Sequence, residues 1–201
     1  MEINRDKSIY NIKRIFPLVD ILLEKYDSPK VYSRDPSIDI EVIAQNCGID
    51  SIVKVPKEEI ENKHAIFENG ILKIALEDPK EKQVFSIAHE IGHIALGHID
   101  ITADYKVARH GDHGKNALIF QIVRDKDIVI NDVLQQFINE DLADYFAANL
   151  LVPMNRYLLW EDRSDQEIAR AFGVEVKCIK RRRQEIANDL PALAVDTMPI
   201  G

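Results

Sequence analysis

The segment 89–93, which reads His-Glu-Ile-Gly-His, restricts what this chain can fold into more than any other part of the sequence. It lies in the apolar run 84–97. Residues four apart on a helix share one face, so His89 and His93 can bind one ion. Zinc accepts neutral imidazole nitrogen, and Glu90, one step round the helix, suits a general base for a zinc-activated water. The alternative is an ordinary helix that carries two surface histidines and a solvated glutamate.

The composition limits the class of protein. The chain has 201 residues, enough for one domain with a small appendage, and 46% of them are hydrophobic. Its net charge of −8 makes direct binding to nucleic acid an unfavoured function for the whole molecule. No apolar run approaches the roughly 18 residues of a membrane span, and the polar start lacks a signal peptide. Cys47 and Cys178 match no metal or redox spacing, which favours a reducing cytoplasm.

The remaining patterns predict an α+β fold that is mainly helical. Residues 8–26 have helical spacing that Pro17 interrupts, so this helix should kink or begin at the proline. A short helix is expected over 39–46, stopped by a glycine. Residues 52–76 predict a small, mainly antiparallel sheet with an Asn-Gly hairpin turn at 69–70.

Two long helices are expected to carry the chemistry. The first should begin with Asp78 as its N-cap and Pro79 at its first position, and end at Gly97. The second should run from residue 131 or 132 until Pro153 closes it.

The C-terminal part predicts two short helices joined at a glycine, the first opened by a capping box at 164–167. Basic residues on the second helix allow it to read DNA, but a pair packed on the main domain is the favoured interpretation. These basic residues are Lys177, Lys180, Arg181, Arg182 and Arg183. The chain thus divides into an N-terminal helical segment (1–36), a central domain (37–160), the helical pair (161–190) and a frayed tail (191–201).

A third metal ligand separates the classes of zinc peptidase. The longer metzincin motif requires a histidine at position 99 and a glycine at position 96, but the chain has Ile99 and Leu96. A site with two histidines and one glutamate needs a glutamate from a later helix, and Glu140 lies on such a helix, 47 residues after His93. Glu140 and Asp144 share a face. This face is either solvated or holds a ligand and its hydrogen-bond partner.

The sequence resembles the ImmA/IrrE metallopeptidase-like family. The resemblance rests on the segment 89–98, His-Glu-Ile-Gly-His-Ile-Ala-Leu-Gly-His, and on 140–153, which follows the family pattern E-x-x-A-N-x-F-A-A-x-L-L-x-P. It covers about residues 38–187. The chain departs from the pattern at Asp144, where asparagine is usual, and in the long stretch 99–131.

The resemblance implies a zincin-like metallopeptidase domain in which His89, His93 and Glu140 bind Zn²⁺ and Glu90 is the base. Asp144 would orient a metal histidine. Members of the family resemble proteases that cleave a DNA-binding, helix-turn-helix repressor in phage, mobile-element or stress-response switches. A metal-binding sensor or interaction module without proteolysis is the alternative, and a DNA-binding regulator that uses residues 165–187 is a third reading.

Peptide hydrolysis also needs a group that stabilises the transition state. The sequence offers several candidates without choosing among them: His98, Tyr105, His110, His113 and Tyr145. For His98, a histidine that interacts with the helix dipole is the simpler interpretation. The stretch 99–131 suggests a lid over the site, and its two histidines could instead hold a second ion.

Overall fold

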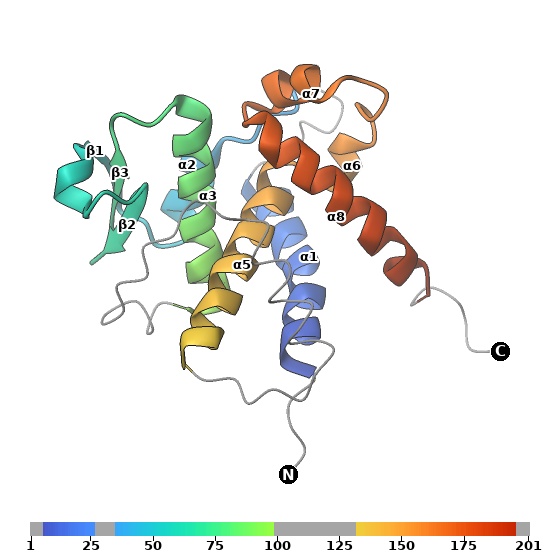
Figure 1. Cartoon of the computed structure of the whole chain (residues 1–201), viewed down its shortest axis with the longest axis horizontal. Coiled ribbons are helices and arrows are strands. Elements are labelled where there is room, and N and C mark those ends of the chain that lie inside the picture. Colours follow the sequence, from blue (N-terminus) through green and yellow to red (C-terminus); the bar gives the residue numbers. More distant parts are fainter. Residues whose placement is uncertain (1–5, 27–34, 99–131, 196–201) are drawn as a thin grey trace, which may run out of the picture.

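The helix that carries the His-Glu-Ile-Gly-His segment and the later acidic helix lie side by side at the centre of the structure. The structure, a computed structural model, describes residues 6–26, 35–98 and 132–195. Figure 1 shows the sheet on one side of the first of these helices, with the acidic helix and the N-terminal helix on the other. The helices are α1 (Asp6–Tyr26), α2 (Ile40–Asn46), α3 (Lys80–Leu96), α5 (Asp132–Leu151), α6 (Met154–Tyr157), α7 (Asp165–Phe172) and α8 (Val176–Val195), with a 3-10 turn, η2 (Lys57–Ile60). The strands are β1 (Ser51–Val55), β2 (Ala65–Glu68) and β3 (Ile71–Ala75).

The sheet is mixed, in the order β1-β3-β2. Strands β2 and β3 form the expected antiparallel hairpin, and Asn69 and Gly70 both have positive φ, 51° and 80°, as a tight turn of this kind requires. Strand β1 pairs with β3 in parallel, Ser51 opposite Ile71 and Val55 opposite Ala75. This pairing differs from the mainly antiparallel sheet expected, because the η2 crossover brings the chain back to the opposite edge of β3.

The main core lies between the sheet and the helices. Leu72 and Ile74 of β3 are buried against the core that Ile87 and Ile91 of α3 share with Phe146 of α5. Alternate residues of a strand face opposite sides, so Ala75 joins a second, smaller cluster with residues of β1 and η2. The sheet therefore supports α3 from one side while α5 packs on it from another.

Of the two expectations for Pro17, a helix start at that residue is wrong, because α1 continues through it. Two further element boundaries differ from the sequence predictions. Helix α3 begins at Lys80 with Pro79 as its N-cap residue and no side-chain cap, because the Asp78 carboxylate instead contacts Lys57 Nζ at 2.8 Å and His64 Nδ1 at 2.5 Å. Helix α8 extends to Val195, so the predicted tail is helical over 191–195.

The C-terminal helices join the same core as the rest of the described chain. The capping box is present, with Ser164 and Glu167 bonded to each other, and Phe172 and Ile179 are buried with residues of α1 and α5. Arg182 is 1% exposed, and its Nε donates to the carbonyl oxygen of Val152 at 3.0 Å. Part of the basic run is therefore internal. None of the described helices has the length and apolar character that crossing a membrane requires.

Candidate metal centre

Helix α3 presents two histidines to one point. His89 and His93 lie one turn apart, are 4% and 6% exposed, and have their Nε2 atoms 2.9 Å from each other. The packing of α3 against the sheet and α5 buries both rings. The alternative of two surface histidines on an ordinary helix is therefore wrong. Two imidazole nitrogens at this separation are arranged for a shared third partner.

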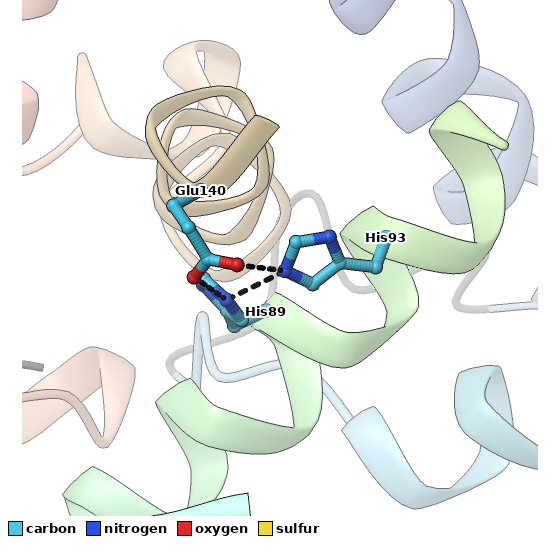
Figure 2. A group of neighbouring side chains, drawn as sticks. All are labelled: His89, His93 and Glu140. Atoms are coloured by element: carbon cyan, nitrogen blue, oxygen red, sulfur yellow. Dashed lines mark hydrogen bonds and ion pairs between the residues drawn. The ribbon is translucent and has the colours of Figure 1, made fainter. Parts of the chain in front are cut away.

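Helix α5 brings a carboxylate to the same point (Figure 2). One oxygen of Glu140 lies 3.2 Å from His89 Nε2, and the other lies 3.4 Å from His93 Nε2. Within the described part of the chain, these three residues form the group whose donor atoms all lie within 4.8 Å of one another and could hold a metal ion. The donor set fits zinc, which takes imidazole nitrogen and carboxylate oxygen and keeps an open position for chemistry in sites with three protein ligands.

Gly92 allows this approach of the two helices. A Cβ at this position would lie 3.1 Å from the Ala143 carbonyl oxygen and 3.2 Å from Ala143 Cα. It would also lie 3.2 Å from a ring carbon of Phe146. The backbone of α5 thus lies against α3 where α3 has no side chain, one residue before His93. The glycine of the His-Glu-Ile-Gly-His segment is a packing residue as well as part of a motif.

Asp144 contacts the far nitrogen of His89. Its Oδ1 lies 2.8 Å from His89 Nδ1, on the side of the ring opposite the nitrogen that faces Glu140. A carboxylate at Nδ1 holds the proton there, so the Nε2 lone pair is directed at the proposed metal position. Burial lowers the pKa of His89, but the hydrogen bonds to Asp144 and Glu140 outweigh it and raise that pKa well above its ordinary value. Without a metal ion Nε2 therefore also carries a proton, which a metal ion would displace to reach the lone pair.

The Glu140 carboxylate is ionised in this setting. Burial raises its pKa, but the bonds from His89 and His93 lower the pKa by more, to well below the usual value. The side chain of Glu140 remains 39% exposed, in contrast to the buried histidines. The group therefore has an ionised carboxylate on its more exposed side and two shielded imidazoles behind it.

His98 contacts the far nitrogen of His93. The two Nδ1 atoms lie 3.2 Å apart, and His98 is 8% exposed. Burial, aided by the neighbouring His93, lowers the pKa of His98 to about 4, so its ring is neutral and can accept a hydrogen bond. His98 therefore lies behind His93 rather than on the Nε2 side, where a transition-state stabiliser would be needed.

The proposed base and the other candidates for stabilising the transition state lie on α3 and α5 or outside the described residues. Glu90 follows His89 on α3 and is half-buried. Tyr145 comes one residue after Asp144 on α5, about 100° further round the helix, and its ring packs edge-on against Phe16 of α1 with centroids 6.0 Å apart. The remaining candidates, together with the predicted lid and the possible second ion site, lie outside the described residues: Tyr105, His110 and His113.

One contact at the centre was not expected from the sequence. Arg181 of α8 donates from Nη1 to Asp144 Oδ2 at 3.0 Å. The only sequence signal for it is a run of basic residues, and that signal equally predicts a DNA-reading helix.

Comparison with known proteins gives two results. The profile described as Peptidase_M78: IrrE N-terminal-like domain matches residues 44–183. Among solved structures, a Mycobacterium tuberculosis transcriptional regulator superposes with a TM-score of 0.51 at 16% identity, covering 87% of this chain and 49% of that chain. This chain thus spans about half the length of that protein, and the likeness concerns the fold. No curated protein matches the chain.

Proposed function

Because the chain belongs to the family of IrrE N-terminal-like domains, whose profile is that of a metallopeptidase, we propose that it is a zinc-dependent endopeptidase. In this proposal His89, His93 and Glu140 hold the zinc ion. The observation that carries it is the convergence of two buried Nε2 atoms and a carboxylate on one point between α3 and α5.

When bound, zinc would supply Lewis acidity, polarising the substrate carbonyl and lowering the pKa of water. Glu90, beside His89 and partly open to solvent, accepts a proton from the attacking water and returns it to the leaving amine. Asp144 and His98 hold the two histidine rings from their Nδ1 sides. The half-exposed Glu140 marks the side from which a peptide approaches.

The substrate that we propose is a regulatory protein, specifically a DNA-binding repressor. Support comes from the family membership and from the structural likeness to a protein described as a transcriptional regulator. A role for this chain as the DNA reader itself is less well supported, because Arg181 and Arg182 of the basic helix are engaged inside the protein.

The test compares Glu140→Gln with Glu90→Gln. We expect about one zinc per wild-type chain by elemental analysis, retention of that zinc in Glu90→Gln, and its loss in Glu140→Gln, because only Glu140 lies among the donor atoms. Cleavage would be followed by mass spectrometry on helix-turn-helix proteins encoded beside the gene. Removing the base should slow cleavage by about 10²–10⁴-fold.

Both variants replace a glutamate with a glutamine of the same size, and they differ only in which carboxylate is removed. Each variant therefore serves as the control for the other. Equal zinc content in Glu140→Gln and wild type would contradict the ligand assignment. Full zinc occupancy with no cleavage of any neighbouring regulator would instead favour a metal-binding sensor module of the same fold.

A further inference from the structure

Arg181 reaches the proposed metal centre through a continuous chain of contacts. Its Nη1 lies 3.0 Å from Asp144 Oδ2, and Asp144 Oδ1 lies 2.8 Å from His89 Nδ1. On the other side of the ring, His89 Nε2 lies 3.2 Å from Glu140. The Asp144 carboxylate therefore uses one oxygen for the guanidinium of α8 and the other for a proposed zinc ligand of α3.

The guanidinium is itself held in place. Arg181 Nε donates to Glu185 Oε1 at 2.7 Å, one turn further along α8. The next residue, Arg182, is buried and donates to Val152 at the end of α5. A planar guanidinium with two fixed donors orients a carboxylate, whereas a flexible ammonium only attracts one. Arg181 is thus built to fix the rotation of Asp144.

We propose that Arg181 is a positioning residue which, by orienting Asp144, makes metal binding depend on the docking of α8. This inference rests on the proposed function. Asp144 is 7% exposed, so a carboxylate that lost its guanidinium partner would turn towards other donors or towards water and would no longer hold the His89 ring in one orientation. Binding free energies are reciprocal: if docked α8 strengthens zinc binding, bound zinc strengthens the docking of α8 to the same extent.

A simple ion pair between two helices would use the same contact without any link to the metal. The two readings differ in zinc affinity, because a pair that only joins helices leaves the orientation of His89 unchanged. The two interpretations also differ in their dependence on Asp144, because a positioning effect of Arg181 on His89 requires the Asp144 carboxylate between them.

The experiment measures the zinc dissociation constant by competition with a chromogenic chelator, in the full chain, for wild type, Arg181→Ala and Lys180→Ala. Lys180 is the matched control, since it is exposed, lies on the same helix and loses the same charge. We expect zinc binding about tenfold weaker in Arg181→Ala, at the low end of what such outer partners contribute, and unchanged in Lys180→Ala. Thermal unfolding of each zinc-free variant verifies that it is folded.

A double-mutant comparison tests the pathway. Asp144→Asn keeps an acceptor for His89 but turns an amide towards Arg181, so Arg181→Ala should have no further effect on zinc affinity in that background. If Arg181→Ala does not fold, Arg181→Lys carries the test, with an expected loss of about threefold because an ammonium lacks the guanidinium fork. Hydrogen exchange supplies an independent readout: zinc should slow exchange in α8 of wild type and not of Asp144→Asn.

Wild-type zinc affinity in a folded Arg181 variant would overturn the inference, as would an equal loss of affinity in Lys180→Ala. Full additivity of the Asp144 and Arg181 effects would also overturn it. These outcomes leave the zinc site itself intact. An absence of zinc binding in wild type would overturn the proposed function, and this inference with it.

Discussion

Gly92 is the residue that decides how closely helices α3 and α5 approach each other. Two effects of adding a methyl group there oppose each other. Alanine favours a helix over glycine by about 0.8–1.0 kcal/mol. Against this, the added Cβ would lie 3.1–3.2 Å from the backbone of Ala143 and the ring of Phe146, and backbone atoms yield little.

For Gly92→Ala we therefore expect a net loss of up to about 2 kcal/mol in the free energy of unfolding, because an overpacking cost of roughly 1–3 kcal/mol is offset by the gain in helix propensity of about 1 kcal/mol. Zinc affinity should fall as well, since Glu140 and the histidines are carried apart with their helices. Urea denaturation and chelator competition measure the two quantities. Gly92→Val should lose more of both, and a Gly92→Ala protein that is more stable than wild type would show that helix propensity prevails.

The residues at the site differ in how far the sequence could predict them. The four-residue spacing of His89 and His93 defines a face of a helix by itself. On the later helix the spacing leaves the face of Glu140 and Asp144 open between solvent and a metal, and the family resemblance is what assigns Glu140 as the ligand. Arg181 could not be found in this way. A basic run is compatible with solvent, with DNA or with a buried carboxylate, and only the tertiary docking of α8 distinguishes them.

Among the elements, the junction before α3 depends on one buried carboxylate. Asp78 joins η2 and the residue preceding β2 through Lys57 and His64, directly ahead of the helix that carries both histidines. Burial raises the pKa of Asp78, but the bonds from Lys57 and His64 lower the pKa by more, to below its ordinary value of 3.8. Burial lowers the pKa of His64 below 6.5, so the neutral ring is the form this junction holds.

We expect Asp78→Asn to lower the free energy of unfolding by about 2 kcal/mol at pH 7, the range for hydrogen bonds to a charged group. Because the native pKa of Asp78 is lowered, its contribution is complete above 3.8 and is lost as pH falls through the native value. The difference between variant and wild type should therefore shrink below about pH 4. Urea unfolding at pH 7 and pH 3 measures it.

Glu81→Gln is the matched control for that experiment, since Glu81 is an exposed acid in the first turn of the same helix. Its effect should stay within about 0.5 kcal/mol, as for other surface changes. A difference between Asp78→Asn and wild type that is as large at pH 3 as at pH 7 would show that shape, rather than charge, matters at this position.

The elements that the sequence predicted well are those specified by neighbouring residues. The Asn69-Gly70 turn and the Ser164 capping box depend on residues within four positions of each other, and both are present. The direction of β1 is different, because alternation within a strand carries no information on which neighbour it pairs with or in which sense. Asp78 has the features of an N-cap locally, yet Lys57 and the neutral His64 ring, both distant in sequence, compete for its carboxylate.

For the molecule as a whole, metal binding and folding are expected to be coupled. The three proposed ligands meet only when α3 and α5 are packed, so zinc should bind the folded chain in preference to the unfolded one. At a free zinc concentration 100 times the dissociation constant, the added stability is about 2.7 kcal/mol. For a chain of this size that corresponds to a rise in Tm of about 5–10 °C.

Differential scanning calorimetry with and without zinc measures this shift. Glu140→Gln should show little of it, because two histidines remain without their carboxylate partner. An equal shift in both proteins would place the zinc elsewhere, and no shift in wild type would contradict the proposed centre.

Because Arg182 is buried, the C-terminal helices cannot be exchanged independently of the rest of the chain. A pair of helices at the end of a chain could be exchanged between genes by recombination if it packed independently of the rest. Here the guanidinium of Arg182 completes the hydrogen bonding at the end of α5, and Phe172 and Ile179 fill the common core. A genetic exchange at residue 160 would leave the Val152 carbonyl without this donor and remove side chains that fill the core beside α5. Descendants of this gene must keep both halves together or evolve compensating changes in each.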